Sequence, residues 1–341
     1  FQIPSDVISN TLLLGMDWNL DKNFGKGQVY DMERPLYATS MSLRPRSLSS
    51  IPSNQQWALY AEERLILPFA GHSLEVVGGI RGTQMLNLAE GFRMKGKFYW
   101  DPRVNVGLTF PKFMVGNRIS FVRISGGVGE HTKFPTMDQL YPDPVYLDLT
   151  QLNYYHANAA YRRVNIMTYV IDPTNKYLTP ARNLKWEVST DVNIGGNRLS
   201  VTLFRENMTS GFRSQSYYAP YTYKWYDTSG IDADALVGPP SLDGLPYELR
   251  KELMGYSYYT NGSQTLKRGV EYTFSSRRIE KLMTRLTING AWFRTTYRNS
   301  MVETYRPSAV IGNKQIQYVG YYKIDGGSMN EMLNTNFTLD T

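Results

Sequence analysis

Residues 184–203 read LKWEVSTDVNIGGNRLSVTL, and this stretch decides the fold class. On both sides of Gly195-Gly196-Asn197, apolar and polar residues alternate, which is the period of a strand whose two faces meet different surroundings. Glycine and asparagine supply the positive φ angles that a tight hairpin requires. The stretch therefore predicts two antiparallel strands joined by a short turn. Its apolar positions are Leu184, Trp186, Val188, Val192, Leu199, Val201 and Leu203.

The same alternation recurs along the whole chain. In residues 11–20, Met16 and Trp18 share one face and Asp17 lies on the other. Period-two alternation over this many segments predicts an all-β protein. About ten strands are expected, near residues 9–20, 54–67, 73–85, 99–110, 117–126, 182–194, 197–209, 264–276, 279–298 and 328–340.

Two local departures from this pattern are expected. In residues 118–125 the apolar phase slips between Phe121 and Val122, which predicts a β-bulge. Residues 241–253 read SLDGLPYELRKEL, with Ser241 or Asp243 near the start, and this pattern predicts a short helix inside a loop.

Short and long connections take turns between the expected strands. The short ones lie near residues 68–73, 111–117, 194–197 and 276–279, and the long ones near residues 21–53, 86–98, 127–181, 210–263 and 299–327. A meander with short turns at one end and long loops at the other is the layout of an antiparallel transmembrane β-barrel of the outer membrane, with periplasmic turns and extracellular loops. A soluble β-sandwich or propeller is the alternative, because its strands also alternate. Long strands, tryptophans near the ends of the apolar faces and charges on the opposite faces favour the barrel.

The composition excludes several classes of protein. The 341 residues contain no cysteine, which removes disulfides, thiolate metal sites and cysteine nucleophiles. The net charge is +7, but the basic residues are scattered in pairs rather than concentrated, so no nucleic-acid partner is expected. The mean hydropathy is −0.40 and no run of about 18 apolar residues occurs, which excludes a transmembrane helix.

Nothing in the sequence marks an active site. The three histidines, His72, His131 and His156, fall in different loops with no second ligand at metal spacing. Adjacent carboxylates such as Glu62 and Glu63 fit a solvated face. We therefore expect no enzyme activity, no catalytic or metal-binding residue and no cofactor.

Tyrosines are concentrated in two of the long loops, around residues 141–161 and 217–226. Flat aromatic rings stack on sugar or macrocycle faces, and neighbouring Asp and Asn side chains orient a ligand by hydrogen bonds. The alternative is that these rings pack against neighbouring loops or form an interfacial girdle. The candidate ligand-binding residues are Tyr141, Tyr146, Tyr154, Tyr155, Tyr217, Tyr218, Tyr221, Trp225 and Tyr226.

Several segments resemble TonB-dependent outer-membrane transporters. Residues 59–63 (LYAEE), 77–81 (VGGIR) and 101–105 (DPRVN) are similar to the family's "YAED", "GLRY" and "DPRL" strand segments. Residues 134–142 (FPTMDQLYP) are similar to its "aPTl.qLYp" segment, and residues 180–187 resemble the lead-in to the following hairpin. The aromatic loops and the final strand resemble those of Bacteroidetes-type, SusC-like members.

The resemblance implies a fold and a function. It implies a 22-stranded barrel preceded by a plug, of which residues 1–341 would be a single partial barrel domain, with the plug and the C-terminal strands absent. It implies import of a scarce nutrient, such as an iron-siderophore, glycan or peptide, energised by the proton gradient through TonB.

The partners follow from the same resemblance. They are outer-membrane lipid, the substrate, and TonB-ExbB-ExbD acting through the missing plug. A SusD-type surface lipoprotein is a further partner if the chain is SusC-like, a subclass that the residues do not separate from stand-alone transporters. The alternative function is a structural or adhesive outer-membrane or surface β-protein.

Overall fold

The protein is almost entirely β-structure. The computed structural model describes residues 2–3, 8–27, 29, 44–312, 314–323 and 327–341. Within them the strands are β1 (Gln2–Ile3), β2 (Ser9–Asp21), β3 (Asn54–Phe69), β4 (His72–Leu86), β5 (Phe98–Thr109), β6 (Phe113–Val115), β7 (Arg118–Lys133), β8 (Val145–Tyr154), β9 (Arg163–Ile171), β10 (Ala181–Ile194), β11 (Asn197–Tyr226), β12 (Tyr247–Ser275), β13 (Arg285–Asn299), β14 (Val302–Tyr305), β15 (Val310–Ile311), β16 (Lys314–Gln315), β17 (Gly320–Lys323) and β18 (Ser328–Asp340). The helical elements of the same residues are α1 (Met137–Leu140) and two 3-10 turns, Leu48–Ser50 and Ala159–Tyr161. None of these described helices has the length and apolar character needed to cross a lipid bilayer.

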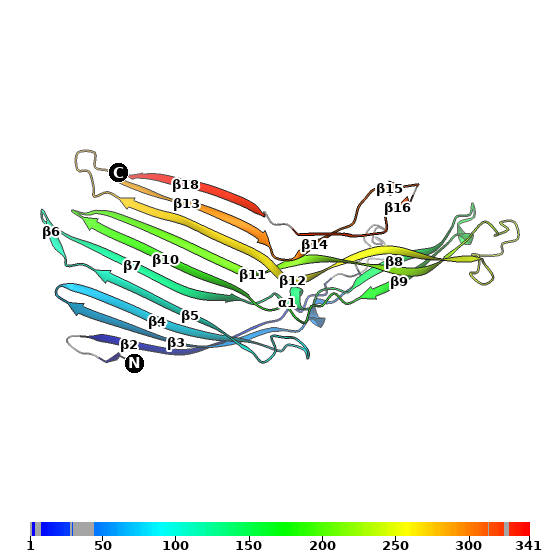
Figure 1. The fold of residues 1–341 in the computed structure, drawn as a ribbon, viewed down its shortest axis with the longest axis horizontal. Coiled ribbons are helices and arrows are strands. Elements are labelled where there is room, and N and C mark those ends of the chain that lie inside the picture. Colours follow the sequence, from blue (N-terminus) through cyan, green and yellow to red (C-terminus); the bar gives the residue numbers. More distant parts are fainter. Residues whose placement is uncertain (1, 4–7, 28, 30–43, 313, 324–326) are drawn as a thin grey trace.

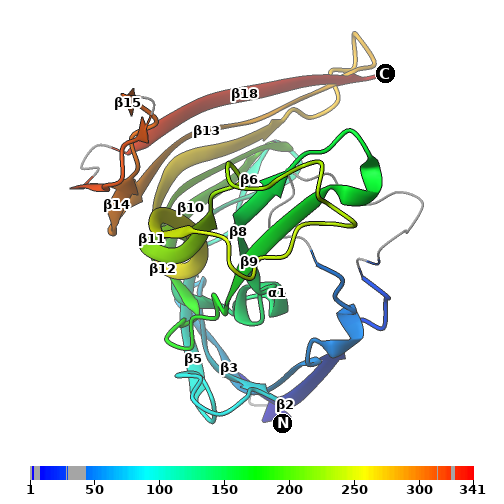
Figure 2. The ribbon, with the colours of Figure 1, turned by 90° about the vertical axis from the view of Figure 1, so that its right-hand side faces the viewer.

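Most of the strands join one antiparallel sheet. Its described strands follow the order β1-β2-β3-β4-β5-β7-β10-β11-β12-β13-β18, and β6 pairs with β7 beside this path. Figure 1 shows the long strands side by side, and Figure 2 shows that the sheet curves into an arc. Within the described residues β18 pairs with β13 alone, so the sheet is open and the ten long strands do not close on themselves.

The hairpin at residues 184–203 forms as its sequence predicts. Strands β10 and β11 pair in unbroken register from Asn183 opposite Met208 to Ile194 opposite Asn197. Gly195 and Gly196 make the turn with φ angles of +59° and +90°, which side chains other than glycine rarely adopt. The strand prediction is therefore confirmed here at the level of individual pairs.

Cross-strand pairing gives the sheet two chemically different faces. Directly paired residues project to the same face, so the alternation of each strand continues across its neighbours. One face, here called the apolar face, carries exposed aliphatic and aromatic side chains, including Leu14, Met16, Leu59, Ile80, Val104, Val188, Leu203 and Leu333. Contiguous exposed apolar surface of this kind marks contact with lipid or with another protein.

The opposite face, here called the charged face, carries ion pairs between neighbouring strands. They include Arg103 with Glu62, Arg64 and Arg123 with Glu75, and Lys185 with Glu206. A cavity of about 380 Å³ opens between Arg103, Lys185 and Glu206, so the charged face is the concave one. A polar interior with an apolar exterior is the arrangement of a membrane barrel rather than of a soluble β-sandwich.

One sequence-based expectation about local structure is wrong, and another holds on one side of a strand. No helix forms at residues 241–253, because residues 247–253 begin β12 and pair with β11, Tyr247 lying opposite Tyr226. Tyrosine favours strands, and this long cross-strand pairing outweighs a short helical pattern. At Phe121, β7 pairs with β10 without a register shift, but on its other side the pairing passes from β5 to β6 between Arg123 and Ser120, and the register there shifts by one residue.

The loops extend the sheet instead of leaving it. Strands β11 and β12 have 30 and 29 residues, so most of the connection expected at residues 210–263 is strand. At the same end of the molecule a small core forms under the loops, in which Met94, Leu140 and Leu178 are fully buried. Helix α1 belongs to this core, and its start is fixed by a capping box between Thr136 and Gln139. The loop end is therefore an ordered part of the structure.

Candidate functional site

A bulge in β11 marks the point where the sheet becomes a two-stranded extension. Residues 212–226 of β11 and 247–261 of β12 form this extension. The register between β11 and β12 shifts between Met208 and Phe212. Asn261 on β12 lies beside this shift, where its amide group donates to the carbonyls of Thr179 and Ser210, each at 2.8 Å. Its carbonyl oxygen accepts from the Thr179 backbone N–H at 2.9 Å. Asn261 thus joins the bulge to the segment that leads into β10.

The β8–β9 hairpin packs on this extension. Leu147, Leu149 and Met254 are buried in the contact. The Tyr169 hydroxyl donates to the Thr222 carbonyl at 2.6 Å, and its ring meets the Tyr221 ring with the centroids 4.9 Å apart. An apolar contact with a hydrogen-bonded tyrosine holds the hairpin in one orientation over the strands.

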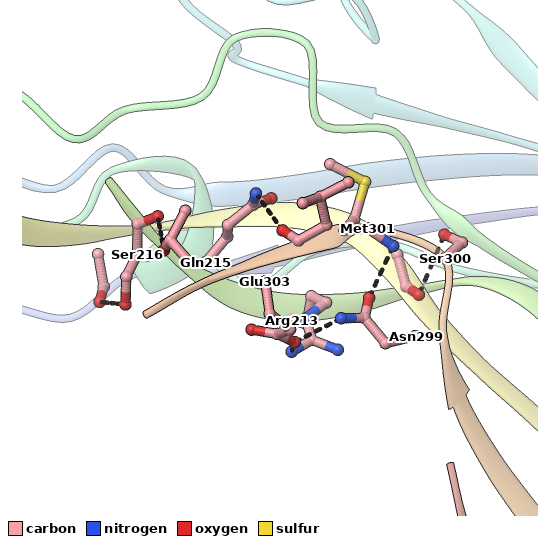
Figure 3. A network of polar contacts seen from close by, with 11 residues as sticks. Arg213, Gln215, Ser216, Asn299, Ser300, Met301 and Glu303 are labelled. Carbon is pink, nitrogen blue, oxygen red and sulfur yellow. Dashed lines mark hydrogen bonds and ion pairs between the residues drawn. The ribbon is translucent and has the colours of Figure 1, made fainter. Parts of the chain in front are cut away.

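A third segment, residues 300–306, crosses the same extension and is called the strap below. The Glu303 carboxylate accepts from Arg213 on β11 and from Asn299 at the end of β13, as Figure 3 shows. The Thr304 hydroxyl also donates to the Ser216 carbonyl at 2.9 Å. Because Arg213 and Glu303 are both largely screened from solvent, this pair is worth more than an exposed one.

Replacing Glu303 with Gln is expected to release the strap. Arg213 would keep its charge without an acidic partner, at a cost of about 1–3 kcal/mol. We expect protease cleavage within residues 300–323 to become about tenfold faster, measured by limited proteolysis of the membrane-inserted protein. Glu248→Gln is the matched control, because its Arg250 partner is in an exposed pair at the same end. Equal cleavage of both variants would contradict the role of Glu303.

The hairpin, the extension and the strap enclose a cleft of about 500 Å³. Its described lining residues are Leu147, Asp148, Leu149, Thr150, Ser216, Tyr218, Tyr223, Glu252, Met254, Gly255, Tyr256, Ser257 and Arg306. Tyr218 lies flat over Gly255, where a Cβ atom would come within 2.5 Å of its ring. The cleft therefore combines aromatic walls with hydroxyl, carboxylate and guanidinium groups.

The charged groups of the cleft differ in how many of their polar atoms have hydrogen-bond partners. Burial raises the pKa of Asp148, but hydrogen bonds from Thr168 at 2.6 Å and Arg44 at 2.7 Å outweigh it, so this pKa lies below its ordinary value. Arg306 is different. One terminal nitrogen donates to Gln315 at 2.9 Å, whereas its buried Nε atom has no hydrogen-bond partner among the described residues. A buried donor without a partner is costly, so Arg306 is stabilised when an acceptor group comes within its reach.

The Tyr256 phenol of the cleft is a neutral donor. Burial raises the pKa of Tyr256, and the neighbouring phenols Tyr221 and Tyr217 raise it further. Among the described residues no three His, Cys, Asp or Glu side chains gather as a metal site. The arrangement can hold a polar ligand by stacking and hydrogen bonding.

The structure distributes the nine predicted ligand-binding residues over five places. Of these nine, Tyr218 lines the cleft, and Tyr217 contacts its wall, with its ring centroid 5.4 Å from that of Tyr256. Tyr221 packs beneath the hairpin, and Tyr141 packs on the buried core, where its hydroxyl accepts from the Ala89 N–H at 3.0 Å.

The other five predicted residues lie on the hairpin and at the far end of the extension. Arginines cover three of these rings, Tyr146 by Arg44, Tyr155 by Arg162 and Trp225 by Arg250. Tyr154 stacks on His156, and Tyr226 meets Tyr247 across the two strands. Four of these five rings are therefore contacted from within the hairpin or across the paired strands of the extension, and Arg44 contacts the fifth from the segment before β3.

Of the thirteen described residues that line the cleft, sequence reasoning named only Tyr218 as a site residue, and those it missed include Tyr223, Glu252, Tyr256 and Arg306. Tyr256 lies directly opposite Tyr217 in the strand register, so recognising the extension of β12 could have found it. Arg306 has no such signal. It is the last residue of the strap, which follows β13 and is held near the cleft by its contacts with β11.

Comparison with known proteins agrees with this architecture. A protein-family model described as "TonB dependent receptor-like, beta-barrel" matches residues 1–278. Among solved structures, the siderophore receptor PirA from Acinetobacter baumannii is similar, with 13% sequence identity and a TM-score of 0.49. The match covers 99% of this chain and 46% of that receptor, so this chain spans about half of its length. No curated protein matches the chain significantly.

The family match settles the class of the protein. The matched segment is 278 of the 341 residues, and it contains the 184–203 hairpin and both faces of the sheet. Proteins of this family are transporters and receptors of the Gram-negative outer membrane rather than an enzyme family. The chain belongs to the TonB-dependent receptor family and forms part of its β-barrel.

Proposed function

We propose that the cleft at the loop end is a ligand-binding site of an outer-membrane transporter that imports a scarce nutrient through TonB. The observation that carries this proposal is the lining of the cleft, in which the Arg306 side chain, whose buried Nε atom has no partner among the described residues, lies with three tyrosines. Such a site suits a small ligand with flat faces and acceptor oxygens, as in an iron-siderophore, a glycan or a peptide. Of the nine predicted residues, Tyr217 and Tyr218 are the ones proposed here to contact it.

We further propose that residues 1–341 are one partial domain of a larger, 22-stranded barrel. The open sheet supports this, since a sheet edge left unpaired within a membrane is not tolerated. The energy-coupling contact with TonB-ExbB-ExbD would then be made by a plug outside residues 1–341, next to the charged face. The SusC-like subtype and a SusD-type partner stay predictions from the sequence resemblance.

Uptake measurements test the binding site. In cells that produce the full-length transporter, we expect uptake of at least one of a panel of radiolabelled ferric siderophores, oligosaccharides and peptides. Replacing Arg306 with Ala should reduce this uptake about tenfold, because a charge-assisted hydrogen bond is lost. Arg277→Ala is the matched control, since Arg277 is exposed in a short turn at the opposite end of the strands.

The two possible failures of this experiment have different meanings. If no nutrient of the panel depends on the protein, the transport proposal fails and a structural or adhesive role is favoured. If uptake occurs and Arg306→Ala leaves it unchanged, transport stands and the cleft is not the binding site.

A further inference from the structure

The apolar face carries an arginine row in which three neighbouring strands place the same residue type side by side. Arg205 on β11 lies directly opposite Arg268 on β12, and Arg268 lies directly opposite Arg294 on β13. Like charges in directly opposed positions of a sheet repel each other. The row is therefore unfavourable unless an anion lies against it.

The described residues neutralise only one end of this arginine row. Arg294 lies 3.7 Å from the Glu331 carboxylate, which also accepts from the Trp292 indole N–H at 2.9 Å. Arg205 and Arg268 are exposed and have no acidic partner among the described residues. Two of the three positive charges, those of Arg205 and Arg268, are thus exposed on the outside of the sheet without a neutralising carboxylate among the described residues.

The arginine row also lies at a boundary on the apolar face. The next row of paired residues towards the short turns is entirely apolar, and it consists of Val188, Leu203, Val270, Trp292 and Leu333. From Asn197 at the turn to Arg205 the tilted strand climbs roughly 20 Å, close to the height of about 25 Å of a barrel's apolar band. Trp186, directly opposite Arg205, fits the interfacial aromatic girdle expected at this height.

We propose that the arginine row binds the phosphate groups of a phosphorylated lipid in the outer leaflet of the membrane. Guanidinium groups bind phosphate through paired, charge-assisted hydrogen bonds. The row lies on the long-loop side of the apolar band, which is the outer leaflet, and the apolar row beneath it provides a surface for acyl chains. A molecule with a phosphate above and hydrocarbon below matches both rows at once. The proposal rests on the membrane placement of the barrel but not on the ligand of the cleft.

Native mass spectrometry of the full-length receptor with added bisphosphorylated lipid A tests the arginine row. The variant R205Q/R268Q should retain about tenfold less of this lipid, whereas R205K/R268K should retain it within about threefold. The matched control R198Q/R285Q removes two exposed arginines from the charged face, and retention should not change.

Three results would overturn the proposal. They are unchanged retention in R205Q/R268Q, equal retention of fully dephosphorylated lipid A, and displacement of lipid A by millimolar inorganic phosphate, which would assign the row to a free anion. Insertion of each variant is checked by its heat-modified mobility on gels, and the charge-conserving variant separates loss of folding from loss of charge. Lipid retention is measured without transport, so this test can fail while nutrient uptake succeeds.

Discussion

Replacing Val201 with Arg is expected to prevent or strongly weaken insertion of the barrel. Val201 lies on the apolar face between Leu199 and Leu203, about halfway between the short turn and the arginine row. An arginine facing lipid near the midplane of a barrel costs about 2–4 kcal/mol. We expect the free energy of unfolding of the full-length protein in lipid vesicles to fall by that amount, measured by denaturant titration of tryptophan fluorescence.

The neighbouring substitution Thr202→Arg is the matched control for Val201→Arg. Thr202 projects to the charged face, where it lies directly opposite Glu271 and within hydrogen-bonding distance of Ser189. An arginine there can pair with the carboxylate in a polar interior, so a change below about 1 kcal/mol is expected. Equal destabilisation by the two substitutions would show that the faces have been assigned wrongly.

Replacing Asn261 with Ala is expected to have the second largest effect on stability. Its side chain satisfies the Thr179 N–H and the carbonyls of Thr179 and Ser210, all partly buried, and alanine would leave these three backbone groups without partners. At roughly 1 kcal/mol for each group, we expect a loss of about 3 kcal/mol. Hydrogen exchange of the amides around residues 179 and 208–212 measures it locally.

Asn165→Ala is the control for Asn261→Ala. Asn165 is also partly buried, but its side-chain amide donates a single hydrogen bond, to Gln151 in the β8–β9 hairpin. Its replacement should cost about 1 kcal/mol and leave the exchange near the β11 bulge unchanged. If Asn261→Ala costs no more than Asn165→Ala, the bulge is held by strand pairing rather than by Asn261.

Sequence patterns predicted the spanning strands well because each spanning strand faces two different media. Along β10 and β11 every second residue meets apolar surroundings, so the period of two is visible without knowledge of any neighbour. The glycine turn between them could be read for a similar reason, since its positive φ angles depend on local geometry alone.

The candidate site was predicted only in part. The tyrosine-rich stretch at residues 217–226 contains Tyr218, which lines the cleft, but Tyr221 packs against Tyr169 of β9 and Trp225 against Arg250 of β12 instead. The same stretch was read as a loop because tyrosine, proline and threonine suit both loops and strands. Its pairing with residues 247–256 depends on a partner about 30 residues away, which no local pattern reveals.

The sequence by itself determined the class of fold, the position of the ten spanning strands and the division of each spanning strand into an apolar and a charged face. These properties depend on the backbone period and on the medium that each residue meets. Only the tertiary structure decided which residues share the cleft, because Asp148, Tyr256 and Arg306 come from three separate segments. The register likewise decided the arginine row, since Arg205, Arg268 and Arg294 are neighbours only through the pairing of β11, β12 and β13. Such contacts follow from long-range packing and pairing, and they are therefore not encoded in any single stretch of the chain.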